Sequence, residues 1–126
     1  MAILVIAEHD DKTVKDATHK TVSAAQAIGG DVDILVAGKG VKDVGADAAK
    51  IAGVRKVLVC DHVSLKRQLA EAMEAVIVPL MDDYDAVLAP DTTTGKNFMP
   101  RISAKLDVMQ ISSITGVESA DTFVRP

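Results

Sequence analysis

The 126-residue sequence has very few aromatic residues: no tryptophan, one tyrosine (Tyr84) and two phenylalanines (Phe98 and Phe123). Proteins commonly hold nucleobases and other flat heteroaromatic rings by stacking them on aromatic side chains. This chain offers almost no side chains for such stacking. The composition therefore argues against a surface that binds flat rings in this way.

Cysteine is also scarce. Cys60 is the one cysteine, so no disulfide can form within the chain. It ends an apolar run without a surrounding redox or metal motif, which predicts a buried, inert thiol. No apolar run approaches the roughly 20 residues of a membrane helix. A strand pattern starts at Ala2, which predicts no signal or transit peptide. We therefore expect a reducing bacterial cytoplasm, or a mitochondrial matrix after processing, and no membrane insertion.

The chain also has no excess of basic residues over acidic ones. The chain has 14 Lys and Arg against 18 Asp and Glu, a formal net charge of −4. Such a chain has no net attraction to phosphate backbones, so we expect no nucleic-acid partner. Hydrophobic residues make up 48% of the sequence, which is typical of a globular chain rather than a disordered one. The length predicts a single domain over 1–126.

Four short apolar runs are rich in Val, Ile and Leu and do not alternate polar with apolar residues. This pattern is typical of parallel strands buried on both faces. Each run ends in polar or turn residues, and amphipathic helical patterns fill the gaps between runs. The expected strands are Ile3–Ala7, Val32–Ala37, Lys56–Cys60 and Ala86–Ala89, and the expected helices cover 14–28, 44–52, 69–80 and 98–106.

Helix boundaries follow from local residues. Asp10 or Asp11 is expected to cap the first helix, and Gly29-Gly30 to end it. Pro100 removes one backbone donor from the last helix, which is therefore either kinked or begins only near Met99. The acidic segment 82–85 is expected to form a solvated turn before the fourth strand.

Alternation of strand and helix predicts a three-layer α/β/α domain with a doubly wound parallel sheet, Rossmann-like in class. Segment 111–118 predicts a fifth strand, 119–121 a tight turn, and 122–125 the start of a sixth strand. This gives the fold an antiparallel strand extension at its C-terminus. A last strand that begins at the chain end leaves an unpaired edge, so we expect the chain to be a piece of something longer.

The best candidate for a binding site is the strand-turn-helix segment 88–106. Ligands of doubly wound sheets bind beyond the carboxyl ends of the strands, where the strand order reverses. If the order is 3-2-1-4-5, the loops 8–11 and 91–96 face each other there. The second loop offers hydroxyls, Gly95, Lys96 and the N-terminus of a helix, which suits an anion such as a nucleotide phosphate.

Other features argue against a phosphate site. Pro90 stands where a phosphate-binding loop would have its first glycine, and Asn97 follows Lys96 where Ser or Thr is needed. The first turn carries Glu8, Asp10 and Asp11, which repel phosphate. The alternative for the loop 91–96 is a capped helix with a solvated turn. The sequence alone does not decide between this and a nucleotide-binding site.

The remaining reactive residue types show no useful spacing. The histidines at 9, 19 and 62 have no metal-site spacing, and no serine lies in a nucleophile elbow. We therefore predict no catalytic, cofactor-binding or metal-binding residue in the chain, and no enzymatic activity of its own.

Several segments together resemble the amino-terminal domain of electron transfer flavoprotein alpha subunits. The resemblance runs along the whole chain in consistent order. It is carried by 4–9 (LVIAEH), 35–38 (LVAG), 51–54 (IAGV), 56–59 (KVLV), 95–97 (GKN) with 100–101 (PR), 104–106 (AKL) and 121–125 (DTFVR).

The resemblance implies an adenine-nucleotide hydrolase-like fold and a role in electron transport. In that family the alpha subunit pairs with a beta subunit as a heterodimer. One FAD is held mainly by the carboxyl-terminal domain of alpha, and a structural AMP lies on beta. Electrons come from acyl-CoA dehydrogenases of fatty acid beta-oxidation and similar enzymes and pass to a membrane quinone oxidoreductase. The amino-terminal domain and the beta subunit form a base on which the FAD domain swivels.

The resemblance assigns no residue of this sequence to the binding of FAD or AMP. It implies a scaffold that docks the beta subunit and its own FAD domain. The alternative is a stand-alone nucleotide-binding module of the universal-stress-protein type, motivated by the fold and the turn 91–96. We also expect an exposed apolar patch formed by Phe123, Val124 and part of the helix 98–102, with Lys96 and Arg101 in subunit or domain contacts. Self-association of the chain is a further expectation.

Overall fold

A computed structural model describes residues 2–10, 12–66, 69–106, 108, 110–111, 114, 116–119 and 122–124. Its main sheet has four parallel strands in the order β3-β2-β1-β4: β1 (Ala2–Ile6), β2 (Asp31–Gly38), β3 (Val54–Asp61) and β4 (Ala86–Leu88). The helices are α1 (Asp16–Ile28), α2 (Lys42–Ala48), α3 (Ala70–Leu80) and α4 (Thr93–Leu106), with short 3-10 turns η1 (Val63–Leu65) and η2 (Met81–Asp83).

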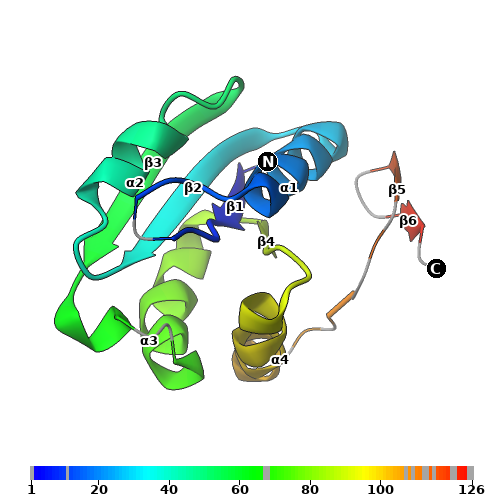
Figure 1. The fold of residues 1–126 in the computed structure, drawn as a ribbon. Coiled ribbons are helices and arrows are strands. Elements are labelled where there is room, and N and C mark those ends of the chain that lie inside the picture. The colour runs from blue at the N-terminus through cyan, green and yellow to red at the C-terminus, as the bar shows by residue number, and fades with distance from the viewer. Residues whose placement is uncertain are drawn as a thin grey trace.

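Helices cover both faces of the sheet. In Figure 1, α1 and α2 lie on one side of the strands and α3 and α4 on the other. Each face has its own apolar core. Ile3, Val5 and Ile34 pack with residues of α1 and α2, and Leu4 and Leu35 pack with residues of α3 and α4. The predicted three-layer, doubly wound α/β fold is confirmed.

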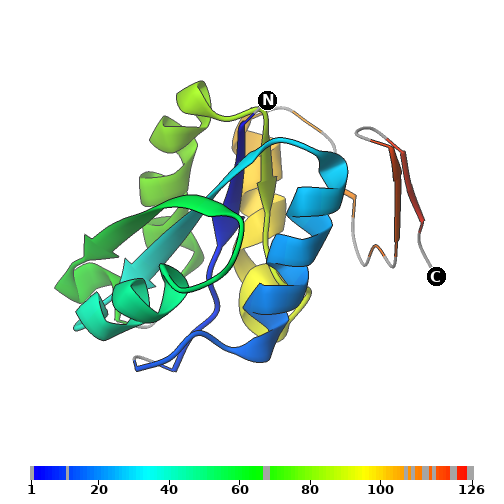
Figure 2. The same cartoon turned by 90° about the horizontal axis from the view of Figure 1, so that it is seen from above.

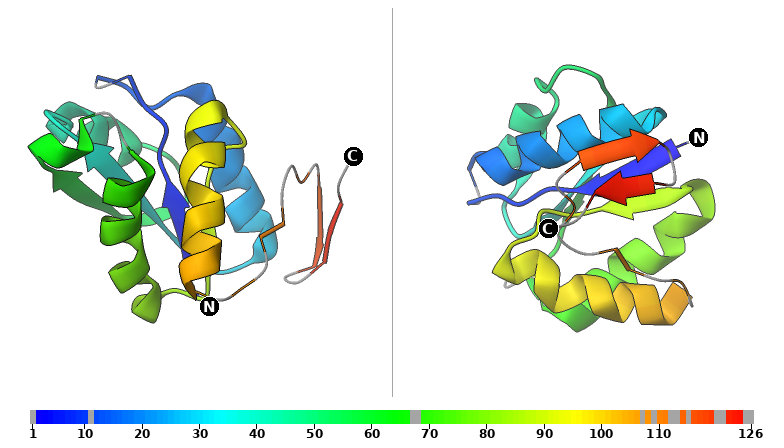
Figure 3. Two further views of the ribbon diagram at one scale, coloured as in Figure 1. Left: turned by 90° about the horizontal axis from the view of Figure 1, so that it is seen from below. Right: turned by 90° about the vertical axis from the view of Figure 1, so that its right-hand side faces the viewer.

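The C-terminal part forms a separate hairpin. β5 (Gly116–Ser119) and β6 (Thr122–Val124) pair only with each other in the described part of the chain, in antiparallel fashion. Figure 3 shows this hairpin beside the main body of the fold. Val117 and Phe123 are partly buried against the core of α1 and α2.

The expected fifth and sixth strands therefore form, but the predicted bounds 111–118 of the fifth are wrong. Ile111 and Ile114 lie outside any strand, and Ser119, expected in the turn, belongs to β5. The hairpin does not extend the four-stranded sheet.

Burial of the strands differs from the sequence prediction. β1 and β2 are buried almost throughout, as predicted for strands inside a parallel sheet. No described residue of β3 is buried, and β4 is only partly buried. The reason is position: β3 and β4 are the two edges of the sheet, each with one neighbouring strand.

Cys60 lies on the β3 edge and is partly exposed. The expectation of a buried thiol is therefore wrong. Its environment follows from the edge position of its strand, which an apolar sequence run does not reveal.

The helix boundaries also correct two expectations. Asp10 does not cap α1: its carboxylate accepts hydrogen bonds from the backbone N–H groups of Lys12 (3.0 Å) and Thr13 (2.7 Å) in the preceding turn, and Lys15 stands at the N-cap. Asp11 lies outside the described residues. α4 begins at Thr93 and runs through Pro100, so the start near Met99 is wrong. Gly29 ends α1 in a left-handed conformation (φ 88°), as predicted.

The acidic segment before β4 is more than a solvated turn. Residues 81–83 form η2, and Tyr84 is buried. Asp85 accepts a hydrogen bond from the backbone N–H of Ala2 (2.8 Å) and donates its own backbone N–H to the Ala2 carbonyl (2.8 Å). The segment thus fixes the start of β4 beside the start of β1.

Candidate functional site

The loop after β1 is held rigidly against the start of α1. The backbone N–H of Glu8 donates to Thr18 Oγ1 (2.8 Å), and the same hydroxyl donates to the Glu8 carbonyl (3.0 Å). Thr18 is fully buried. His9 Nε2 lies 2.9 Å from the carbonyl oxygen of Ala37. Hydrogen bonds from the backbone of Thr13 and then of Lys12 hold the pKa of Asp10 below its usual value, so this turn stays negatively charged.

The loop after β4 caps its own helix. Thr92 Oγ1 accepts a hydrogen bond from the backbone N–H of Gly95 (3.4 Å), and the Thr92 carbonyl accepts from the N–H of Lys96 (2.8 Å). Gly95 packs so closely on Pro90 that an added Cβ would collide with the Pro90 carbonyl oxygen. The helix N-terminus at Gly95 was expected to suit an anion, but the Gly95 N–H is already bound to Thr92.

The two loops do face each other, as the strand order predicts. Glu8 from the first loop and Thr92, Thr94 and Gly95 from the second line one crevice, with Phe98 closing it. The space between them is only about 10 Å³, which is room for roughly one water molecule. Sites for nucleotide-sized ligands need about 300 Å³ or more, so this crevice does not accommodate a nucleotide.

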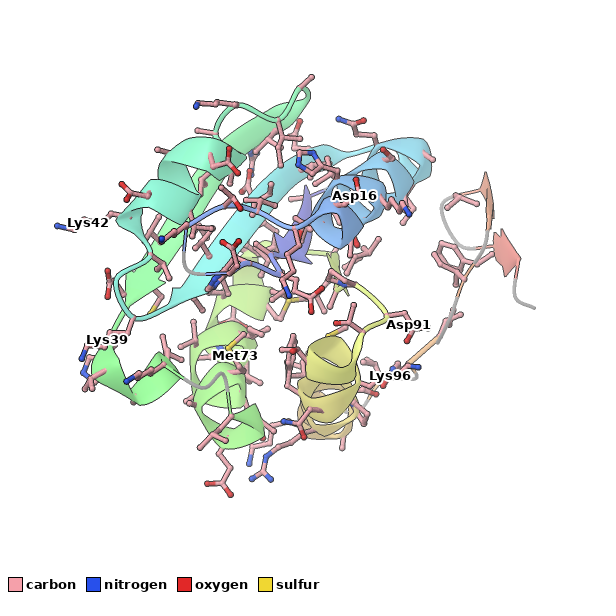
Figure 4. The ribbon with its side chains drawn as sticks, in the orientation of Figure 1. Asp16, Lys39, Lys42, Met73, Asp91 and Lys96 are labelled. Atoms are coloured by element: carbon pink, nitrogen blue, oxygen red, sulfur yellow. The ribbon has the colours of Figure 1, made fainter. Side chains whose placement is uncertain are left out.

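A larger cavity of about 380 Å³ lies along the outer edge of β4. Thr21 of α1, Met99 of α4 and Ile111 of the segment after α4 are among the residues that line it. Its charged groups are paired: Lys96 Nζ lies 3.8 Å from Asp91 Oδ1, and Lys20 Nζ lies 3.5 Å from Asp16 Oδ2. Figure 4 shows Asp91 and Lys96 together at the start of α4.

This cavity differs from a phosphate or metal site in its chemistry. Each lysine has an acidic neighbour, and the floor is the edge of a strand rather than the carboxyl ends of two strands. A partly apolar hollow along a strand edge suits another polypeptide segment better than a charged small molecule. The cavity is therefore a candidate docking surface.

Lys96 and Arg101, which were expected in subunit or domain contacts, lie in different surroundings. Lys96 lines the cavity. Arg101 Nε instead bonds Glu74 Oε2 at 2.9 Å and joins α4 to α3, and this hydrogen bond raises the pKa of Arg101 above its usual value. The expectation of an exposed patch on the helix 98–102 is wrong, because Phe98 and Ile102 are buried in the core. The side chain of Val124 lies outside the described residues.

Exposed large apolar side chains gather elsewhere. Among the described residues, Val59 lies on β3, and Val63 and Leu69 follow it in the chain. Val108 and Ile111 follow α4, and Ile111 lines the cavity beside β4. A sequence pattern could not locate these positions, because it does not say which strands are the edges of the sheet.

A second polar cluster, missed by sequence reasoning, lies toward the amino ends of the strands. Asp33 on β2 is fully buried. Its carboxylate accepts hydrogen bonds from Arg55 Nε (3.0 Å), Arg55 Nη2 (2.8 Å) and the Tyr84 hydroxyl (2.5 Å), and Lys56 Nζ lies 3.8 Å away. The exposed Asp31 also meets Arg55 at 3.2 Å.

The pKa shifts in this cluster follow from its contacts. Burial alone would raise the pKa of Asp33, but the hydrogen bonds from Arg55 and Tyr84 outweigh it and leave the pKa below its usual value. Burial and the Asp33 carboxylate raise the pKa of Tyr84 to about 12. Tyr84 therefore remains a hydrogen-bond donor at neutral pH. Asp33 has a hydrogen-bond partner for each carboxylate oxygen, and neither Asp33, Arg55 nor Tyr84 lines one of the two cavities. We therefore interpret this cluster as stabilising the fold.

The described residues show no group of three or more His, Cys, Asp or Glu that could hold a metal ion. His62 accepts a hydrogen bond from the backbone N–H of Ser64 (3.1 Å) and caps η1. In the same part of the chain, no helix is long and apolar enough to cross a membrane.

Comparison with known proteins decides the family. Residues 3–126 match the model of the electron transfer flavoprotein domain. The chain belongs to this family. The resemblance inferred from the sequence is thereby confirmed, and the fold is the one expected from it.

The chain is similar to electron transfer flavoprotein alpha subunits from several organisms. It is 55% identical over 126 residues to that of Pseudomonas aeruginosa and 46% identical over 127 residues to that of Paracoccus denitrificans. In both cases all of this chain and 41% of the relative are covered. The mitochondrial alpha subunit of Dictyostelium discoideum is 40% identical over 131 residues, covering 98% of this chain and 37% of that protein. The chain thus spans about two fifths of the length of these relatives.

Proposed function

We propose that the chain is the amino-terminal scaffold domain of an electron transfer flavoprotein alpha subunit. In this role it docks a beta subunit and an FAD domain and binds no FAD itself. The whole protein would carry electrons from acyl-CoA dehydrogenases and similar enzymes to a quinone oxidoreductase. Its compartment would be the bacterial cytoplasm or the mitochondrial matrix. The relative from Dictyostelium discoideum is named as mitochondrial.

The observation that carries this proposal is the span of the match. The whole chain aligns with alpha subunits, but it accounts for only 41% of the Pseudomonas aeruginosa and Paracoccus denitrificans proteins. A domain of an electron carrier need not contain the redox group, provided that it positions the domain that does. This chain supplies a folded α/β body with an exposed apolar side chain at each edge of its sheet, Val59 on β3 and Ile111 at the cavity beside β4.

The side chains available for cofactors also support the proposal. Tyr84 and Phe98 are buried in the core, so neither presents a free ring face for a flavin, and Phe123 is partly buried against the core. The crevice between the β1 and β4 loops is too small for an adenine nucleotide. These observations favour the scaffold role over a stand-alone nucleotide-binding module.

We assign docking of the beta subunit to the β4 side of the fold. Ile111 is 49% exposed there and lines the cavity beside Leu88 and Met99. An apolar segment of the partner could fill this hollow and extend the sheet from its β4 edge, a common mode of recognition. The sheet ends at β4 in the described part of the chain, so the outer side of β4 has no strand partner there.

Co-expression with a tagged beta subunit tests this assignment. The chain is expected to co-purify with the beta subunit, and Ile111→Lys should weaken binding about tenfold, roughly 1.4 kcal/mol, by placing a charge in the apolar hollow. Val63→Lys is the matched control, because Val63 is also exposed but follows β3. Failure of the unchanged chain to bind any beta subunit would contradict the docking role. Equal binding by both variants would contradict the assignment to the β4 side.

A further inference from the structure

We draw no further inference here: the strongest candidate, the β3 edge at the margin of the fold (Figure 2), where Val59 is exposed and the exposed Val63 follows in η1, carries no proposal because nothing in the described part of the structure shows what covers it.

Discussion

Replacing Asp33 with asparagine is expected to lower the free energy of unfolding by about 3 kcal/mol at neutral pH. The carboxylate is fully buried and binds both Arg55 and Tyr84. The asparagine amide cannot accept all of these hydrogen bonds and carries no charge to balance the guanidinium. Arg55 is 46% exposed and can recover some hydration, which keeps the loss at the lower end for a broken buried pair. Urea unfolding followed by circular dichroism measures this difference.

Asp31→Asn is the matched control for this experiment. Asp31 meets the same guanidinium at 3.2 Å, but it is 65% exposed. Exposed ion pairs contribute about 0.2–1 kcal/mol, so the control should lose at most that amount. Similar losses from the two substitutions would contradict a special role for the buried carboxylate.

The same pair of proteins has a predictable pH dependence. Because the pKa of Asp33 is lowered in the folded state, its stabilising contribution is fully present above the unfolded pKa of about 3.9. It is lost as the pH falls through the lower, folded value. The stability difference between the unchanged chain and Asp33→Asn should therefore be constant near neutral pH and shrink below about pH 4. A difference that shrinks as the pH rises would contradict the sign of the shift.

Gly95→Ala is expected to destabilise the fold by about 2 kcal/mol or more. An added Cβ at this position meets the carbonyl oxygen of Pro90, which is backbone and cannot rotate away. Helix propensity alone predicts the opposite sign, since alanine stabilises a helix interior by about 0.5–1 kcal/mol relative to glycine. The sign of the measured change in urea unfolding therefore decides between local propensity and tertiary contact.

Asn97→Ala provides the control on the same helix. Asn97 is exposed two residues further along α4, so its substitution should change stability by less than about 0.5 kcal/mol. A stabilising Gly95→Ala substitution would show that the loop after β4 is not packed against the start of α4, and it would reopen the question of a ligand in the crevice.

The layered fold could be predicted because its strongest signals are local. The apolar runs at β1 and β2 and the glycines after α1 specify strands and a helix end without knowledge of their partners. The exposure of β3 and the separate β5–β6 hairpin could not be predicted in this way. They depend on which strands become edges, and that is decided by pairing between distant segments.

The site was predictable in position but not in size. Strand order alone brings the loops after β1 and β4 together, as expected. The crevice between these loops is small because Gly95 packs on Pro90 and Thr92 caps α4. The spacing of residues in the sequence does not reveal these contacts. The sequence does carry one signal for Asp33, which is the one charged residue in the apolar run 32–37. Its partners, Arg55 and Tyr84, lie 22 and 51 residues away, so only the fold brings them together.

Flavin binding by the purified chain tests the scaffold proposal most directly. The protein is incubated with excess FAD, passed through a desalting column, and measured for visible flavin absorbance relative to protein concentration. The account predicts no retained flavin, because the crevice between the β1 and β4 loops is too small for a nucleotide and the rings of Tyr84 and Phe98 are buried in the core. Retention of one FAD per chain would contradict it.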